Sequence, residues 1–212
     1  MTDEHSGSSS SFSSISTSEG VVNDDTQTVK GLTFGTIRTY LIENHGEAGW
    51  EAFLAKLPRR SRTLLNECEF TEWYPETELR RIIHALHEHL AEGDDERFME
   101  LCRGIALAGI SRFFRMVLTL ASAKFVLRNI PTFWKRLRRG PARVTVETVS
   151  DSLIKIHYSD YRYCRDPLYR LLSLANCQAG VYAATKQIPK SEVESWTGDS
   201  MTLVFHLGQS QA

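Results

Sequence analysis

Two adjacent stretches decide the fold: RVTVETV at residues 143–149 and SLIKIHY at residues 152–158. Apolar and polar residues alternate in both, which is typical of strands that bury one face. Ser150 and Asp151 lie between them and suit a tight turn. The two stretches therefore predict a β-hairpin.

A helix and two more strands are predicted after the hairpin. Residues 166–186 carry apolar side chains at helical spacing, including Leu168, Leu171 and Leu172. Residues 190–196 and 201–207 each suit a strand, and TGDS at residues 197–200 joins them. The C-terminal part is thus expected to form a β-β-α-β-β antiparallel unit.

The chain before the hairpin has the spacing of helices. Segments 36–42, 47–57, 61–67 and 79–90 each bury one apolar face, and a long helical region is expected from about residue 96 to residue 129. Breaks are expected near Gly46 and at Pro58. Helices segregated from an antiparallel sheet define the α+β class.

The N-terminal segment differs from the rest. Residues 1–20 contain nine serines, and almost nothing in residues 1–30 can be buried. Such a segment cannot offset its ordering entropy, so residues 1–30 are predicted to be a disordered tail and residues 31–212 a single domain.

Composition excludes several classes of protein. The net charge of −1 gives no overall attraction to nucleic acid. The most apolar stretch, residues 104–127, contains Arg112, Arg115 and Lys124, which disfavours a membrane span. No signal peptide is visible at the start. Four scattered cysteines without a C-x-x-C pair suggest buried thiols in a reducing compartment, so the chain is expected to be cytoplasmic.

Two polar clusters have both a functional and a plain explanation. His84 and His87 lie about one helical turn apart, but with His89 they fit a solvated helix face better than a metal site, and no metal is expected. The basic run around Phe133 and Trp134 either binds an anionic surface or acidic partner, or forms a solvated helix end. Its candidate contact residues are Lys135, Arg136, Arg138 and Arg139.

Further cations are candidates for binding a ligand. Arg112 and Arg115 lie in the most apolar segment, where they either pair with an acidic ligand in a cavity or reach water or an internal carboxylate. The junction at residues 158–165 either binds an anion at a helix start, or Asp166 simply caps that helix with Pro167 in its first turn. No nucleophile–base–orienter trio or phosphate loop appears, so no enzyme is expected.

The order of elements over residues 30–207 resembles the haem-dependent nitric-oxide/oxygen-binding (H-NOX) domain. That family carries a Y-x-S-x-R motif for the haem propionates, and this chain has Tyr158, Asp160 and Arg162 at the corresponding positions, with aspartate in place of serine. The family's haem-ligating histidine lies on a helix before the hairpin, whereas this chain has no histidine between His89 and His157. The chain is therefore more similar to haem-less relatives of this fold, as in myxobacterial paralogous families, and to 4-vinyl-reductase-type domains.

The resemblance implies a non-catalytic sensing module without haem. Its ligand would be apolar or acidic-apolar, held by residues among Tyr158, Asp160, Arg162, Arg112 and Arg115, and its output would need a signalling partner or a homodimer. Two alternatives remain open at this point. One is a haem-based gas sensor with an unusual axial ligand such as Cys164 or His157. The other is a scaffold domain whose basic run contacts an acidic partner.

Overall fold

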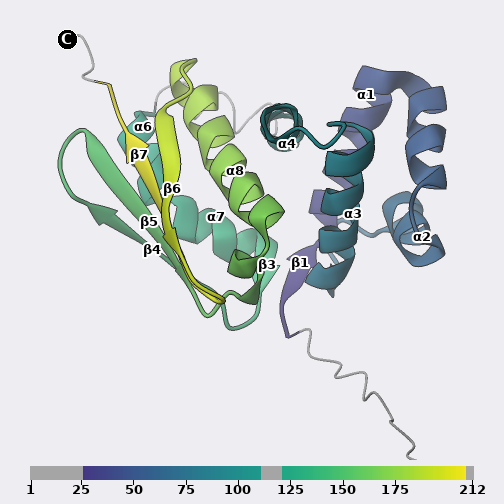
Figure 1. Ribbon diagram of the computed structural model, residues 1–212, viewed down its shortest axis with the longest axis horizontal. Coiled ribbons are helices and arrows are strands. Elements are labelled where there is room, and N and C mark those ends of the chain that lie inside the picture. The colour runs from purple at the N-terminus through teal and green to yellow at the C-terminus, as the bar shows by residue number, and fades with distance from the viewer. Residues whose placement is uncertain (1–25, 111–120, 209–212) are drawn as a thin grey trace, which may run out of the picture.

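The predicted hairpin and the last two strands form one four-stranded antiparallel sheet, and the helix between them packs on it. In the computed structural model, which describes residues 26–110 and 121–208, the strands lie in the order β4-β5-β7-β6 and α8 covers the sheet (Figure 1). The predicted β-β-α-β-β unit is confirmed. Its bounds are β4 (Arg143–Thr148), β5 (Leu153–Ser159), η1 (Arg162–Arg165), α8 (Pro167–Thr185), β6 (Lys190–Trp196) and β7 (Met201–His206).

The alternation of apolar and polar residues in the strands gives this sheet one buried face and one polar face. Ile154, Ile156 and Tyr158 of β5 point to the buried face, where α8 packs together with α6 (Ala123–Arg128) and α7 (Ile130–Leu137). The other face is polar: Lys155 pairs with Glu194, at 2.6 Å from Nζ to Oε1. Burial of one face of a pleated sheet is what fixes its register.

The other half of the domain is formed by helices from the first part of the described chain: α1 (Gly31–Ala55), α2 (Arg59–Glu67), α3 (Glu76–His89) and α4 (Asp95–Gly109). The break predicted near Gly46 is confirmed, because α1 is two helices joined where Gly46 has a φ of +68° and a ψ of 175°. Only glycine adopts this backbone conformation readily. α4 packs on both α1 and α8, so it joins the helical half to the sheet half (Figure 1).

A second, smaller sheet ties the start of the domain to its middle. β1 (Thr28–Lys30) lies between β2 (Trp73–Pro75) and β3 (Arg138–Arg139), in the order β2-β1-β3. Val29 is fully buried, so the domain begins before residue 31, which corrects the expected boundary. The remainder of the expected tail, residues 1–25, lies outside the described residues.

The prediction of a single helix from about residue 96 to residue 129 is wrong. α4 ends at Gly109, and Ile110 has a ψ of 107°, in the extended region. α6 then starts at Ala123, where the Ser122 side chain accepts a hydrogen bond of 3.1 Å from the Phe125 N–H. Serine favours such capping positions over helix interiors, so the apolar composition of this segment misled the prediction.

Asp166 shows how the junction between β5 and α8 is built. Its side chain accepts a hydrogen bond of 3.1 Å from the Leu168 N–H, and Pro167 occupies the first turn of α8. The explanation of Asp166 as a helix cap is therefore confirmed. Within the described part of the chain, no helix combines the length and hydropathy needed to cross a membrane.

Candidate functional site

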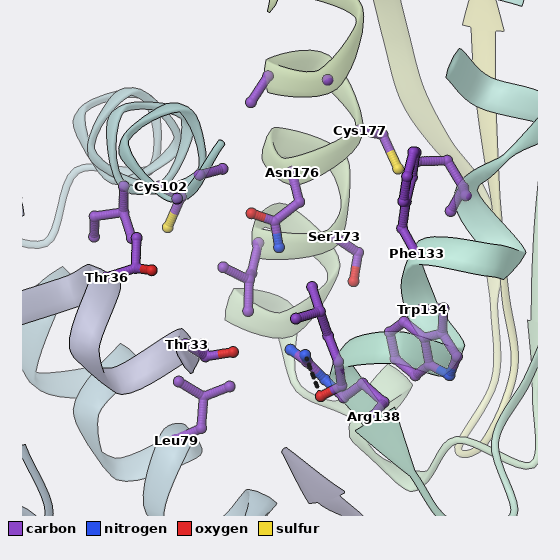
Figure 2. A pocket seen from close by; sticks show the side chains of 18 of the residues that line it. Thr33, Thr36, Leu79, Cys102, Phe133, Trp134, Arg138, Ser173, Asn176 and Cys177 are labelled. Atoms are coloured by element: carbon purple, nitrogen blue, oxygen red, sulfur yellow. Dashed lines mark hydrogen bonds between the residues drawn. The ribbon is translucent and has the colours of Figure 1, made fainter. Parts of the chain in front are cut away.

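A cavity of about 470 Å³ lies between the helical half and the sheet half of the domain. α1, α3 and α4 line one side, and α6, α7 and α8 line the other (Figure 2). A cavity of this size is typical of sites for small organic molecules. Leu32 lines it while remaining 38% exposed, so the cavity reaches the molecular surface.

The lining is mostly apolar. Its aliphatic and aromatic members include Ile37, Leu79, Ile83, Leu86, Ile105, Val126, Ile130, Phe133, Trp134 and Leu172. The periodic apolar faces of α3 and α8 that the sequence predicted supply part of this wall. Because no charged side chain interrupts that part of the wall, it favours an apolar occupant.

The polar side chains that α1 and α8 contribute to the described lining, Thr33, Thr36, Ser173 and Asn176, fall into two pairs. Thr36 and Ser173 each donate a hydrogen bond of 2.8 Å to a carbonyl four residues earlier in their own helix, at Leu32 and Tyr169 respectively. Thr33 and Asn176 make no side-chain hydrogen bond to any other described residue. Thr33 and Asn176 point into the space between α1 and α8 (Figure 2).

The one charged side chain among the described lining residues is Arg138, and its charge is balanced. Its Nε donates a hydrogen bond of 2.8 Å to Oε1 of Glu76, and both side chains are buried. Burial alone would lower the pKa of the Arg138 guanidinium, but the charge of Glu76 outweighs it, and the pKa is raised. Arg138 therefore remains a cation that is paired within the protein.

Tyrosines and a tryptophan surround this ion pair. The Tyr161 hydroxyl donates to Oε1 of Glu76 at 3.0 Å, and the Tyr169 hydroxyl donates to the Glu76 carbonyl at 3.2 Å. The Trp134 ring packs edge-on against the rings of Tyr158 and Tyr161, at centroid distances of 5.3 and 5.0 Å. Hydrogen bonds and ring packing thus hold the polar wall of the cavity in one arrangement.

The structure separates the residues predicted to bind a ligand. Tyr158 lines the cavity and is buried. Asp160 and Arg162 are exposed and absent from the lining, and Asp160 lies 3.7 Å from Arg143, between Oδ2 and Nε. Arg112 and Arg115 lie outside the described residues.

The predicted surface patch needs one correction. Lys135, Arg136 and Arg139 are exposed, as expected of a surface patch, but Arg138 is buried and points toward Glu76. The reason is local: at Arg138 the chain leaves α7 and enters β3, which turns this side chain inward while its neighbours face solvent. Arg139 instead lies over the Trp73 ring, 4.0 Å from its centroid.

The three clustered histidines have three different partners. His84 lies 2.7 Å from Oδ2 of Asp166, and His87 lies 3.1 Å from Oδ1 of Asp95. His89 lies 3.9 Å from Glu88. Among the described residues, no group of three His, Cys, Asp or Glu side chains is arranged to hold a metal ion.

The donors that the described lining residues offer do not fit a haem, the cofactor of the alternative gas-sensor prediction. Haem iron is held by imidazole, thiolate, thioether or phenolate donors, and no described lining residue is a histidine or methionine. Burial raises the pKa of the Cys102 thiol, and it raises the pKa of Cys177 to about 12, so both lining thiols are protonated at neutral pH. Burial, with Cys177 nearby, likewise raises the pKa of Tyr158.

Neither axial ligand considered for a gas sensor belongs to the cavity lining. Cys164 is buried in η1, and burial raises its pKa to about 12. His157 lies on the polar face of the sheet, 3.1 Å from the Thr202 hydroxyl and 3.2 Å from Glu147. Both residues are therefore poor candidates for an iron ligand in this cavity.

Sequence reasoning missed Asn176, Trp134 as a lining residue, and the Arg138–Glu76 pair. A signal for Asn176 existed, because it shares the apolar face of α8 with Leu172 and Ala179 at spacings of four and three. The pair of Arg138 and Glu76 had no local signal, since its partners are 62 residues apart.

The fold as a whole is similar to solved H-NOX structures. An Fe(II) unliganded H-NOX protein from K. algicida aligns with a TM-score of 0.61 at 11% identity, over 86% of this chain and 98% of that one. An H-NOX protein from S. oneidensis in the Fe(II)NO ligation state aligns with a TM-score of 0.57 at 17% identity, over 85% and 99%. An oxygen-binding H-NOX domain related to soluble guanylate cyclases, in its oxygen complex, aligns with a TM-score of 0.57 at 15% identity, over 84% and 94%.

These alignments confirm the H-NOX-like fold that the element order predicted. No protein-family model matches the sequence, and no curated protein matches it. Identities of this size show a shared fold alone. The chemistry of the site therefore has to be argued from its own residues.

Proposed function

We propose that this chain is a non-catalytic sensory module that binds an apolar small molecule, without haem, in the cavity between its helical half and its sheet half. The observation that carries the proposal is the cavity itself, which has a volume of about 470 Å³ and a mostly apolar lining. Among its described lining residues one side chain is charged, and it is already paired. Apolar pockets with a few placed polar groups are the usual form of small-molecule sites.

The absence of haem in this proposal follows from the donor chemistry. The two lining thiols and Tyr158 carry raised pKa values, and the one described lining cation already pairs with Glu76. Haem propionates would find no free cation among these residues. The H-NOX structures that share this fold include an Fe(II)NO form and an oxygen complex, which supports a ligand-binding role for this chain.

Output from the module would pass through α7. This helix lines the cavity through Ile130, Phe133 and Trp134, while Lys135 and Arg136 on its other side are exposed. A ligand that shifts α7 would therefore move two surface cations. This movement would change how tightly an acidic signalling partner or a second copy of the chain binds. The double variant K135E/R136E is expected to abolish partner binding without changing ligand affinity.

An obstruction experiment tests the ligand-binding proposal. Ala106 of α4 lines the cavity, whereas Ala108 of the same helix is exposed and does not. Ala106→Phe is expected to abolish binding of a neutral polycyclic hydrocarbon fluorophore, measured by equilibrium titration, because the ring would fill the cavity. Ala108→Phe is the matched control and should bind like the wild type. Equal binding by both variants, or no binding by the wild type, overturns the proposal.

A further inference from the structure

Asn176 is an exposed residue of α8 on the wall of the cavity. It lies in the middle of a 19-residue helix, where asparagine is less favourable than most residues because its side chain competes for backbone hydrogen bonds. Its amide bonds to no other described residue, and its side chain lines the cavity. Its exposed amide is therefore accessible from the cavity, in a wall that is otherwise mostly apolar.

The cavity has a second unbonded polar group facing Asn176. Thr33 lies in the first turn of α1 on the opposite wall, and Figure 2 shows Thr33 and Asn176 on either side of the same space. By contrast, the hydroxyls of Thr36 and Ser173 are already bonded to carbonyls in their own helices. Hydrogen-bonding capacity is therefore left over at two facing positions.

The charge balance of the wall disfavours an anionic ligand. Arg138 is the one cation among the described lining residues, and Glu76 lies 2.8 Å from it with its side chain fully buried. A ligand carboxylate beside this pair would add a negative charge without a partner, and burying an unpaired charge is costly. Asn176, as both a donor and an acceptor, instead matches a hydroxyl, carbonyl or amide group.

We infer that the ligand is an uncharged amphiphile, a long apolar body with one alcohol, ketone or amide group, and that Asn176 recognises that group with Thr33 opposite. This inference rests on the proposed function and narrows the apolar or acidic-apolar ligand expected from the sequence to the uncharged class. The apolar body would lie along α3 and α4, against Leu79, Ile83 and Ile105.

Three probes of equal chain length test the inference: 1-decanol, 2-decanone and decanoate, titrated calorimetrically at pH 7.5. The alcohol and the ketone are expected to bind at least about ten-fold more tightly than the carboxylate, because they leave no charge unpaired. Asn176→Leu should weaken binding of both neutral probes by about three- to ten-fold, the value of one hydrogen bond. It should leave a hydrocarbon fluorophore unaffected.

A second variant separates recognition from packing. Asn176→Asp keeps the shape of the side chain but replaces the amide with an anionic carboxylate that only accepts hydrogen bonds. Because the position is exposed, the charge stays solvated, and the variant should retain 1-decanol and lose 2-decanone. Ser173→Ala, one turn away on α8, is the control, since its hydroxyl already bonds to Tyr169, and both probes should bind it normally.

The outcomes separate this inference from the proposed function. Decanoate binding as tightly as decanol, or a loss in Asn176→Leu that is equal for all probes, overturns the inference while leaving the cavity as a binding site. Failure of every probe, the hydrocarbon included, overturns the proposed function and the inference together.

Discussion

Arg138 and Glu76 form a buried ion pair, at 2.8 Å from Nε to Oε1, that joins the end of α7 to the start of α3. The pair connects the two halves of the domain at the cavity wall. Trp134 lies against the same guanidinium, 5.2 Å from its ring centroid. The rigidity of the polar wall thus depends on a contact between residues 62 positions apart.

Breaking this pair is expected to be costly. Arg138→Met should lower the free energy of unfolding by about 3–5 kcal/mol, because it leaves the Glu76 charge buried without its partner. Adding Glu76→Gln should recover part of the loss, since the remaining side chains are then both neutral. Urea denaturation measures both, with exposed Arg136→Met as a control that should stay within about 0.5 kcal/mol of the wild type. Additive losses in the double variant would contradict the pairing.

Asp166 is expected to make stability depend on pH in the acid range. Burial by itself would raise its pKa, but hydrogen bonds from His84 and Arg80 outweigh that effect and lower the pKa below 3.8. A group with a depressed folded-state pKa stabilises the protein above its unfolded pKa, and the contribution is lost as the pH falls through the folded value. Thermal unfolding of the wild type should therefore lose this contribution as the pH falls below about 4.

Two variants of Asp166 separate its charge from its capping role. Asp166→Asn keeps an acceptor for the Leu168 N–H, so it should flatten the acid part of the stability curve while keeping the cap. Asp166→Ala removes both and should cost about a further 0.5–2 kcal/mol at pH 7. An unchanged pH profile in Asp166→Asn would show that another carboxylate is responsible.

The bend in α1 depends on one glycine. A Cβ at Gly46 would meet no atom within 4 Å, so packing does not oppose Gly46→Ala. The backbone does oppose it, because φ is +68° and ψ is 175°, and the variant should lose about 1–3 kcal/mol of stability. Gly198 also has open space around its Cβ position but an ordinary φ, so Gly198→Ala should be nearly neutral in the same melting experiment.

The alkylation rates of the cysteines measure how accessible the cavity wall is. Burial raises the pKa of Cys102, and it raises the pKa of Cys177 to about 12, so alkylation at pH 8 should be at least ten-fold slower at these sites than in unfolded chains. Half-buried Cys68 should react first. Peptide mapping by mass spectrometry gives the order, and a saturating ligand should slow Cys102 further. Labelling of Cys102 as fast as Cys68 would mean that the cavity wall opens freely.

The sheet half was predictable because its signals are local. Alternation in residues 143–158, turn residues at Ser150 and Asp151, and the Asp166–Pro167 helix start each act within a few positions, and the structure has all of them. The bend at Gly46 was predictable for the same reason, because a single glycine indicates it.

What the sequence could not predict depends on distant partners. The strands β1, β2 and β3 have two or three residues each and exist because they pair with one another across the domain. In the sequence, Arg138 cannot be distinguished from its cationic neighbours, because the contact with Glu76 that buries it forms only in the folded domain. A continuous apolar composition concealed the end of α4 at Gly109, because composition does not show where a helix stops.

The most direct test of the central proposal is a native mass spectrum of the full chain, purified gently from its own host, with an absorption spectrum of the same sample. An apolar cavity without a free iron donor predicts a stoichiometric adduct of an uncharged organic molecule and no Soret band. The adduct should disappear in Ala106→Phe and persist in Ala108→Phe. An adduct of haem mass with a Soret band would contradict the proposal and make the chain a haem-based sensor.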